Sequence, residues 1–461
     1  MNILLLQPND VLFFRDGRPM TGSLAGHGAA WPMPNVINAA LHAALHRSGL
    51  AKDAHSHRRG GRCVYQEDAQ RDRKFGSLVT AGPFPVRDGN TWFFPRPLDL
   101  QDATLQPALL PDASFDSLRS SLAVPLEYAV ANQLQPTKNS GAKTWLSQAA
   151  YDRYLDPASP ALLDGEALND SDFADTEHAI GIGIDPTTGS QDGKRIYAAH
   201  YLRLREDWQL GVCAAADDKE FNHAQHGKDL VKALLNGGQH EIIVGGQQRI
   251  CSARLVAKAP PLPRGKADGF NELNGKWLVK WILLSPAVWP AIEVNVGRNI
   301  SMHPGGSLPN WIDPRTGAVL LKSGDTARGR QSREAWRQRV RQQPGIAARL
   351  VASLIPKPLV VSGWALPDEA GGTEAERNGG AQSTHLAVPA GAVYYFEAEP
   401  DFNGGPGNAI ALAAALNWHG SETAPTTIRN RRSALLGEKG FGLGVCGTWE
   451  FFPDVGGRST Q

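Results

Sequence analysis

Two apolar runs near the start of the chain, residues 3–6 and 11–14, flank a polar break at residues 8–10. Short apolar runs bounded by Pro, Asn and Asp are typical of β-strands, so this segment predicts a strand, a loop and a second strand. In residues 35–47 apolar side chains recur every four positions, which predicts an amphipathic helix. Asn35 is the expected N-cap of that helix, because its side chain can accept a hydrogen bond from a free backbone N–H.

Further along the chain, residues 179–185 alternate with period two, residues 186–189 form a turn sequence, and residues 195–204 return as a second apolar run. This pattern predicts a long β-hairpin. Near the middle of the chain, the Ile-Leu-Leu-Ser-Pro of residues 282–286 repeats the Leu-Leu-Leu-Gln-Pro of residues 4–8. The echo indicates a duplicated domain that begins with a strand.

A proline-rich segment at residues 260–265 precedes this second start and has the composition of a linker. A chain of 461 residues is long enough for two or three domains. We therefore predict an α+β protein with one domain over residues 1–265 and another over residues 276–461.

The chain carries 47 Lys and Arg against 46 Asp and Glu, a formal net charge of +1. This balance points neither to nucleic acid nor to an anionic membrane as a partner of the whole surface, so any nucleic-acid site must be local. Residues 52–74 and 326–350 are locally basic, and what they contact stays open. Residues 152–177 are strongly acidic and would repel a phosphate backbone.

No apolar run approaches the roughly 18 residues that span a bilayer, and the start of the chain lacks the basic flank of a secretory signal. The expected location is the cytoplasm, without a membrane partner. The four cysteines are far apart and form no C-x-x-C pair, which predicts reduced thiols in the core rather than a zinc site or a disulfide framework: Cys63, Cys213, Cys251 and Cys446.

A glycine-rich segment near the end of the chain carries two motif matches. Residues 442–447 fit G-x-G-x-x-G, but too little chain remains for the helix and acidic residue of a dinucleotide fold. Residues 439–442, Lys-Gly-Phe-Gly, match the first four positions of the RNA-recognition signature. The glycines allow close approach to phosphate or to another chain segment, and Phe441 either stacks on a base or fills the core. A plain tight turn is the alternative.

Candidate catalytic residues do not form a set. His42 and His46 lie one helical turn apart, but Ala43 stands where a metalloprotease has its general base. No serine-nucleophile elbow or complete phosphate-binding loop occurs, so we expect neither enzyme activity, nor a metal, nor a cofactor. Arg15 and Arg18 join two cations to a turn, which could bind an anion.

Five segments, taken together and in order, resemble the third subunit of the Cmr complex, the type III-B CRISPR RNA-guided effector of antiviral defence. They are residues 8–19, 31–34, 181–185, 387–396 and 437–449. The resemblance implies a protein of the RAMP superfamily with two ferredoxin-like (RRM-like) βαββαβ domains and large loop insertions. It also implies a non-catalytic, RNA-binding subunit of a ribonucleoprotein. Such a subunit holds the 5′ handle of the CRISPR guide RNA and contacts the large polymerase-like subunit and a backbone subunit.

The residues expected to contact RNA are basic residues on Gly- or Pro-flanked loops and the glycine-rich loop: Arg15, Arg18, Lys138, Lys143, Lys439, Gly440, Phe441 and Gly442. Two alternatives stay open. A related RAMP class cleaves repeat RNA with a histidine near the first helix, where His27, His42 and His46 occur. A purely structural subunit would bind only protein.

Overall fold

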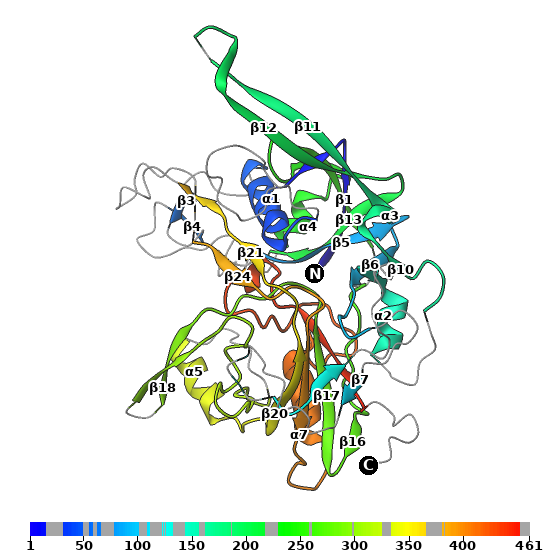
Figure 1. Ribbon diagram of the computed structural model, residues 1–461, viewed down its shortest axis with the longest axis vertical. Helices are drawn as coiled ribbons and strands as arrows, with labels where there is room; N and C mark the ends of the chain where they lie inside the picture. Colours follow the sequence, from blue (N-terminus) through cyan, green and yellow to red (C-terminus); the bar gives the residue numbers. More distant parts are fainter. Residues whose placement is uncertain are drawn as a thin grey trace, which may run out of the picture.

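The computed structural model describes most of the chain (Figure 1): residues 1–14, 31–48, 55–58, 62–65, 78–100, 108–110, 122, 124, 126–131, 143–155, 162–185, 187–216, 229–257, 261–296, 299–324, 333–365, 380–381 and 383–451. The described part is mixed α/β, with few helices and two main sheets in which every neighbouring pair of strands is antiparallel. None of its helices is long and apolar enough to cross a bilayer.

The N-terminal sheet has eight strands in the order β10–β9–β6–β5–β13–β1–β15–β14. Helix α1 (Pro34–Arg47) and the short α4 (Leu230–Leu234) cover one face of this sheet, where their apolar side chains join one core cluster. The strands are β1 (Asn2–Pro8), β5 (Val79–Arg87), β6 (Thr91–Pro95), β9 (Trp145–Ser147), β10 (Ala167–Leu168), β13 (Trp208–Ala215), β14 (His240–Ile243) and β15 (Ile250–Val256).

The C-terminal sheet has five strands. Its central strand β17 pairs with β25 on one side and with β16 and β26 on the other, and β20 lies beyond β25. In both sheets the first long strand, β1 or β17, therefore lies between two later strands. The elements are β16 (Asn271–Leu273), β17 (Lys276–Leu283), β20 (Ala348–Leu354), β25 (Val393–Ala398), helix α7 (Gly407–Leu416) and β26 (Gly444–Thr448).

One of the hydrophobic core clusters contains side chains from both sheets. Side chains alternate across a strand, so Leu4 and Leu6 of β1 pack under α1, whereas Ile3 and Leu5 point to the other face. There they join the same cluster as Ile282 of β17 and residues of β25 and β26. Burial on both faces explains why the strand predicted at residues 3–6 is continuously apolar rather than alternating.

The predicted hairpin is confirmed. Strands β11 (Ala174–Ile184) and β12 (Gln191–Leu204) extend away from the body of the molecule at the top of Figure 1. The second predicted N-terminal run supplies β2 (Leu12–Phe13), which pairs with the base of β12. Three isoleucines along one face of the hairpin are exposed: Ile180, Ile182 and Ile184.

The predicted helix is present, but its start is not where the sequence analysis placed it. Pro34 is the first residue of α1 and Met33 is the N-cap, without a side-chain cap hydrogen bond. Proline is favoured at the first position because its fixed φ suits the helix and its missing N–H would have no partner there. The expectation that Asn35 caps the helix is therefore wrong.

The remaining described elements are short. Helices α2 (Gln148–Tyr154) and α3 (Asp170–Phe173) lie beside the edge of the N-terminal sheet, and α5 (Arg333–Gln342) precedes β20. Short strands pair as β3 (His55–Arg58) with β4 (Arg62–Tyr65), β7 (Ala108–Leu110) with β8 (Ala129–Ala131), β18 (Ile292–Val296) with β19 (Asn299–His303), β21 (Leu359–Val361) with β24 (His385–Ala387), and β22 (Trp364–Ala365) with β23 (Gly380–Ala381).

Candidate nucleic-acid interface

The glycine-rich loop joins the two halves of the molecule. It begins with the 3-10 turn η3 (Gly437–Lys439) and continues into β26. Gly440 has a φ of +91°, and a Cβ added there would lie 2.8 Å from the carbonyl oxygen of Thr80 in β5. Asn38 of α1 donates from Nδ2 to the Thr80 hydroxyl (3.2 Å) and to the carbonyl oxygen of Glu438 (3.4 Å). Glycine is thus required because two distant segments meet here without room for a side chain.

The Phe441 side chain lies in the core. Its ring has no exposed surface and packs in a cluster with Val288, Val361 and Ala387. Of the two alternatives for this residue, stacking on a base and filling the core, the structure shows the second. A ring without an exposed face cannot stack on a base, so the stacking expectation does not fit this structure, whereas an RNA contact by the backbone of Phe441 stays a prediction.

The two flanking glycines have their backbone N–H groups engaged within the chain. Gly440 donates to the carbonyl oxygen of Gly437 (3.1 Å), and Gly442 donates to that of Pro286 (2.7 Å). Gly442 also has a positive φ of 77°, and an added Cβ would collide with Ser433. The conformation of the loop therefore serves packing first, and an RNA contact by Gly440 or Gly442 stays a prediction.

Beside this loop lies a basic side chain that the sequence analysis did not single out. Arg431 has a buried Nη1 atom without a hydrogen-bond partner, and no carboxylate in the described part of the chain forms an ion pair with it. Burial lowers the pKa of Arg431, although the nearby Glu438 acts in the opposite direction. The Cβ position of Gly437 is 3.7 Å from the Cβ of Arg431, so this side chain begins next to the loop that carries Lys439.

The neighbours of Arg431 are engaged. Arg429 forms an ion pair with Glu422. Arg432 donates from Nε to the carbonyl oxygen of Ala415 (2.7 Å), and burial lowers its pKa to about 10. Lys439 is half-buried and forms no ion pair within the described residues. Two unpaired cations, Arg431 and Lys439, thus border the glycine-rich loop. The Arg-Asn-Arg-Arg run at residues 429–432 was the available sequence signal.

A cleft of about 640 Å³ lies beside this junction, with walls from both halves of the chain. Aromatic side chains form part of its wall, and the rings of Trp31 and Trp145 meet edge to face at 5.3 Å. Asn35 lines the cleft with a buried Oδ1 that has no hydrogen-bond partner. Asp170 accepts a hydrogen bond from Trp145 Nε1 (2.6 Å). The other wall comes from residues of the C-terminal half, including Leu284, Ser285, Pro286, Pro358, Leu359, Val360, Val361, Ser362, Pro389 and Ala390.

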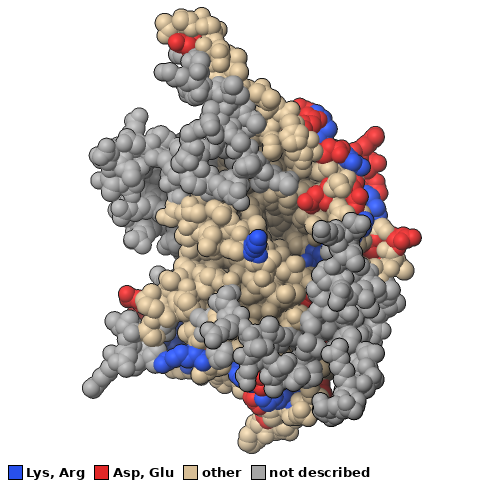
Figure 2. Space-filling view, in the orientation of Figure 1, with Lys and Arg blue, Asp and Glu red and all other residues tan. Residues whose placement is uncertain are grey.

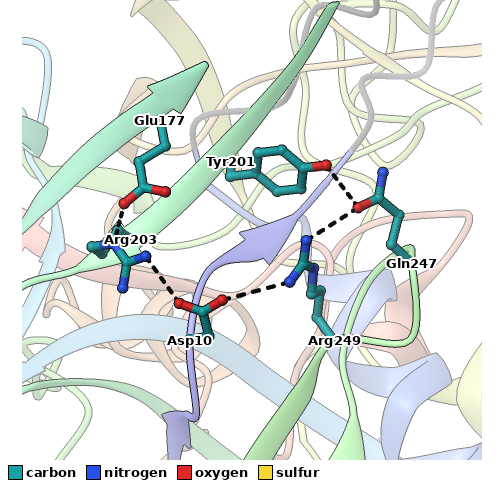
Figure 3. A network of polar contacts seen from close by, with 6 residues as sticks. All are labelled: Asp10, Glu177, Tyr201, Arg203, Gln247 and Arg249. Atoms are coloured by element: carbon teal, nitrogen blue, oxygen red, sulfur yellow. Dashed lines mark hydrogen bonds and ion pairs between the residues drawn. The ribbon is translucent and has the colours of Figure 1, made fainter. Parts of the chain in front are cut away.

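A polar network fixes the chain that leads into this cleft (Figure 3). Asp10 forms ion pairs with Arg203 of β12 (2.9 Å) and with Arg249 (3.6 Å), the residue before β15. Tyr201 donates from its hydroxyl to Gln247 (2.9 Å), and the Arg249 guanidinium lies 4.9 Å from the Tyr201 ring centroid. The segment after Asp10, which ends at the cleft, is therefore held to both the hairpin and the sheet.

Comparison with protein families identifies the chain. A family model described as "CRISPR-associated protein (Cas_Cmr3)" matches residues 4–449. The chain belongs to this family. The resemblance carried by the five sequence segments is thereby confirmed. No curated protein matches the chain.

Solved structures with a similar chain come from type III CRISPR complexes, at low identity. A chain of the type III-B Cmr-beta complex bound to cognate target RNA is 12% identical, with 85% of this chain and 86% of that chain covered and a TM-score of 0.36. A chain of the Csm3–Csm4 subcomplex of the type III-A interference complex is 10% identical, with 86% and 92% covered and a TM-score of 0.36. A chain of the Csm1–Csm4 cassette with AMPPNP is 13% identical, with 66% and 94% covered and a TM-score of 0.26.

The other predicted RNA contacts of this family member fall in different places. Lys143 lies next to the cleft residues Thr144 and Trp145 and forms an ion pair with Asp172 at 3.6 Å. Arg15, Arg18 and Lys138 lie outside the described residues. Arg15 directly follows the cleft residue Phe14 in the sequence.

Acidic side chains gather along one edge of the face in Figure 2, where α3 and β10 lie. In the acidic stretch at residues 152–177, carboxylates form ion pairs with neighbouring cations: Glu166 with Arg153, Asp172 with Lys143, Asp175 with Arg205, and Glu177 with Arg203. The middle of the same face is largely uncharged. The cleft between the halves, and not this edge, is the candidate RNA surface.

The histidines of the cleavage alternative are only partly described. His42 lies on α1 and has interactions of its own, whereas His27 and the side chain of His46 lie outside the described residues. Within the described residues, no three His, Cys, Asp or Glu side chains are grouped so that they could hold a metal ion.

Proposed function

We propose that the protein is a non-catalytic, RNA-binding subunit of a type III-B CRISPR effector complex. In this role it holds the 5′ handle of the guide RNA and joins the large polymerase-like subunit to the backbone subunit. Membership of the Cmr3 family supports an effector role. The chain order β1–α1–β5–β13–α4–β15 and the sheet order β15–β1–β13–β5 support a ferredoxin-like unit. The C-terminal order β26–β17–β25–β20 supports a second one.

The observation that carries this proposal is the unpaired Arg431 beside Lys439. Arg431 is partly buried, and its Nη1 has no hydrogen-bond partner among the described residues although Glu438 lies nearby. A buried donor without a partner is unfavourable. A phosphate would accept a hydrogen bond from this atom and would pair with the guanidinium charge. We therefore add Arg431 to Lys439 as a phosphate contact at the glycine-rich loop.

The cleft supports the same function, because its lining contains groups of the kind that contact RNA bases. Single-stranded RNA is recognised by aromatic surfaces that stack on bases and by polar groups that bind base edges. Trp31 provides a partly exposed aromatic wall, and the Asn35 side chain, whose Oδ1 is buried without a hydrogen-bond partner, would accept a hydrogen bond from a base amino group after turning toward the cleft. A volume of about 640 Å³ is within the usual range for pockets that bind small ligands.

The test is binding of guide RNA to the full chain at several salt concentrations. Arg431→Gln and Lys439→Ala should each weaken binding and lower the salt slope by about one unit, because each removes one phosphate contact. Arg429→Ala, which breaks a surface ion pair with Glu422, is the matched control and should leave the slope unchanged.

Equal affinity and equal slope for a folded Arg431→Gln protein would contradict the proposed contact. The same samples report on catalysis, since the proposal expects repeat RNA to stay intact. Metal-independent cleavage that His42→Ala abolishes would favour the endoribonuclease instead.

A further inference from the structure

The loop between β25 and α7 lies at the end of the molecule opposite the hairpin (Figure 1, bottom). This loop carries the exposed aromatic residue Phe402. Phe402 is 101% exposed, more than any other large apolar residue in the described part of the chain, and Ile180 follows at 79%. Large aromatic side chains ordinarily bury most of their surface, and they are enriched where one protein inserts a side chain into another.

The loop around Phe402 is rigid, because one carboxylate organises it. Asp401 accepts hydrogen bonds from the backbone N–H groups of Asn403 (2.9 Å), Gly405 (2.8 Å) and Gly407 (3.1 Å). The Asp401 N–H in turn donates to the carbonyl oxygen of Gly405 at 2.9 Å. A Cβ at Gly407 would collide with the Asp401 carboxylate, so only glycine allows this closure.

A second side chain ties the loop to the C-terminal sheet. Asn408 donates from Nδ2 to the carbonyl oxygens of Glu399 (3.1 Å) and Pro400 (3.2 Å). Its Oδ1 accepts from the backbone N–H of Ala347 (3.1 Å), just before β20. Phe402 is thus presented by a preorganised loop, which loses little conformational entropy when it binds a partner.

The charge next to Phe402 selects the class of partner. Asp401 forms no ion pair with any described residue. Glu399 is half exposed, and its one ion pair among the described residues is with Lys276 at 3.5 Å, which also pairs with Glu397. Hydrogen bonds from the backbone of Gly405 and Asn403 hold the pKa of Asp401 below its usual range, so the carboxylate stays ionised. An ionised carboxylate adjacent to the ring repels RNA phosphates and attracts lysine or arginine.

We propose that Phe402 is a docking anchor that inserts into an apolar pocket, rimmed by Lys or Arg, on another protein subunit of the same effector complex. The identity of the partner as an effector subunit rests on the proposed function. The anchor itself rests on the exposed ring, the Asp401-centred loop and the acidic surroundings. It is distinct from the RNA surface, which lies at the junction of the two halves.

The experiment measures the full-length chain against the purified large subunit, the purified backbone subunit and guide RNA, each in a separate titration. Phe402→Ala should weaken binding to one of the two proteins by roughly 30-fold or more, the effect of losing an interface hot spot. Phe402→Leu should recover part of the loss. Leu163→Ala, at another exposed apolar residue (64%), is the matched control and should change binding less than threefold.

The outcomes separate this inference from the proposed function. Guide-RNA affinity should be unchanged in Phe402→Ala, whereas Arg431→Gln should lower it without affecting the protein contact. Wild-type binding of Phe402→Ala to both subunits would overturn the proposal. A loss of RNA affinity alone would make Phe402 a base-stacking residue and would also overturn it. A loss only of self-association, measured by sedimentation, would assign the ring to a second copy of the chain.

Discussion

Three buried cysteines show how the core of this protein changes the pKa of single side chains. Cys213, Cys251 and Cys446 are buried and free, as their spacing predicts, whereas the side chain of Cys63 lies outside the described residues. Burial raises the pKa of Cys213 and of Cys251 to about 12 and raises that of Cys446 as well. The folded protein therefore keeps these protons at pH values where an unfolded chain, with a thiol pKa near 8.5, releases them.

We predict that the free energy of unfolding falls as the pH rises above about 8.5. Because the unfolded state binds fewer protons there, each buried thiol should lower stability by about 1.3 kcal/mol between pH 8 and pH 9.5. Urea denaturation at both pH values measures this change. In Cys213→Ala the pH-dependent loss should be smaller by that amount, whatever the variant's absolute stability. Identical losses in the two proteins would show that Cys213 does not couple to folding in this way.

At the scale of elements, the hairpin formed by β11 and β12 has a narrow attachment. Among the described residues, the hairpin pairs beyond its own two strands only with β2, through Leu202 with Leu12 and Tyr201 with Phe13. The network around Asp10 reinforces that attachment, because it links the hairpin through Arg203 to Arg249 at the sheet. The orientation of a long projecting element thus depends on a few contacts at its base.

Asp10→Ala should loosen the base of the hairpin without unfolding the protein. Exposed ion pairs contribute up to about 1 kcal/mol, so amide exchange at Leu12 and Leu202 should accelerate about two- to fivefold while global stability stays nearly constant. Hydrogen exchange followed by mass spectrometry resolves this segment. Arg205→Ala, which removes the nearby pair with Asp175, is the control and should leave these amides unchanged. Equal exchange in wild type and Asp10→Ala would mean that strand pairing alone holds the hairpin.

At the scale of the whole molecule, a buried ionic cluster connects the two halves. Asp99 and Lys280 are almost inaccessible, and Lys280 Nζ lies 3.6 Å from Asp99 Oδ2. Tyr395 donates to the same oxygen (2.6 Å), and Tyr154 donates to the other. Burial lowers the pKa of Lys280, whereas Asp99 partly counters that effect. Lys280 and Tyr395 come from the C-terminal sheet and the other two from the N-terminal half, so this cluster sets how the halves meet.

Removing one partner of the buried Asp99–Lys280 pair should lower the free energy of unfolding far more than replacing both partners by apolar residues. Asp99→Ala leaves a buried ammonium group unpaired and should destabilise the protein by about 3–5 kcal/mol. The double variant Asp99→Leu with Lys280→Met replaces both charges by apolar groups and should lie much closer to the wild type. Denaturant titrations of the three proteins measure the difference. A double variant as unstable as Asp99→Ala would show that the hydrogen bonds from the tyrosines, rather than the charges, dominate.

The sequence by itself determined the elements whose cause is local. A short apolar run predicted the strand at residues 3–6, four-residue spacing predicted the helix at residues 35–47, and period-two alternation predicted the hairpin, because the pattern of apolar positions records which sides of an element are buried. The echo of residues 4–8 at 282–286 indicated two strand-first units, and the five matched segments carried the family.

Only the tertiary structure decided which face meets which partner. Asn38 bonds to a residue 400 positions away, and no local pattern states that the loop at Gly440 lies against Thr80. The sequence around Phe441 does not distinguish a ring that stacks on a base from one that fills the core, and only the packing of the two halves shows that the ring is buried. Arg431 became a candidate for the same reason: only the folded chain shows that Arg429 and Arg432 are engaged while Arg431 Nη1 has no hydrogen-bond partner among the described residues. Spacing along a chain specifies burial, whereas pairing across hundreds of residues is specified only once the sheets pack together.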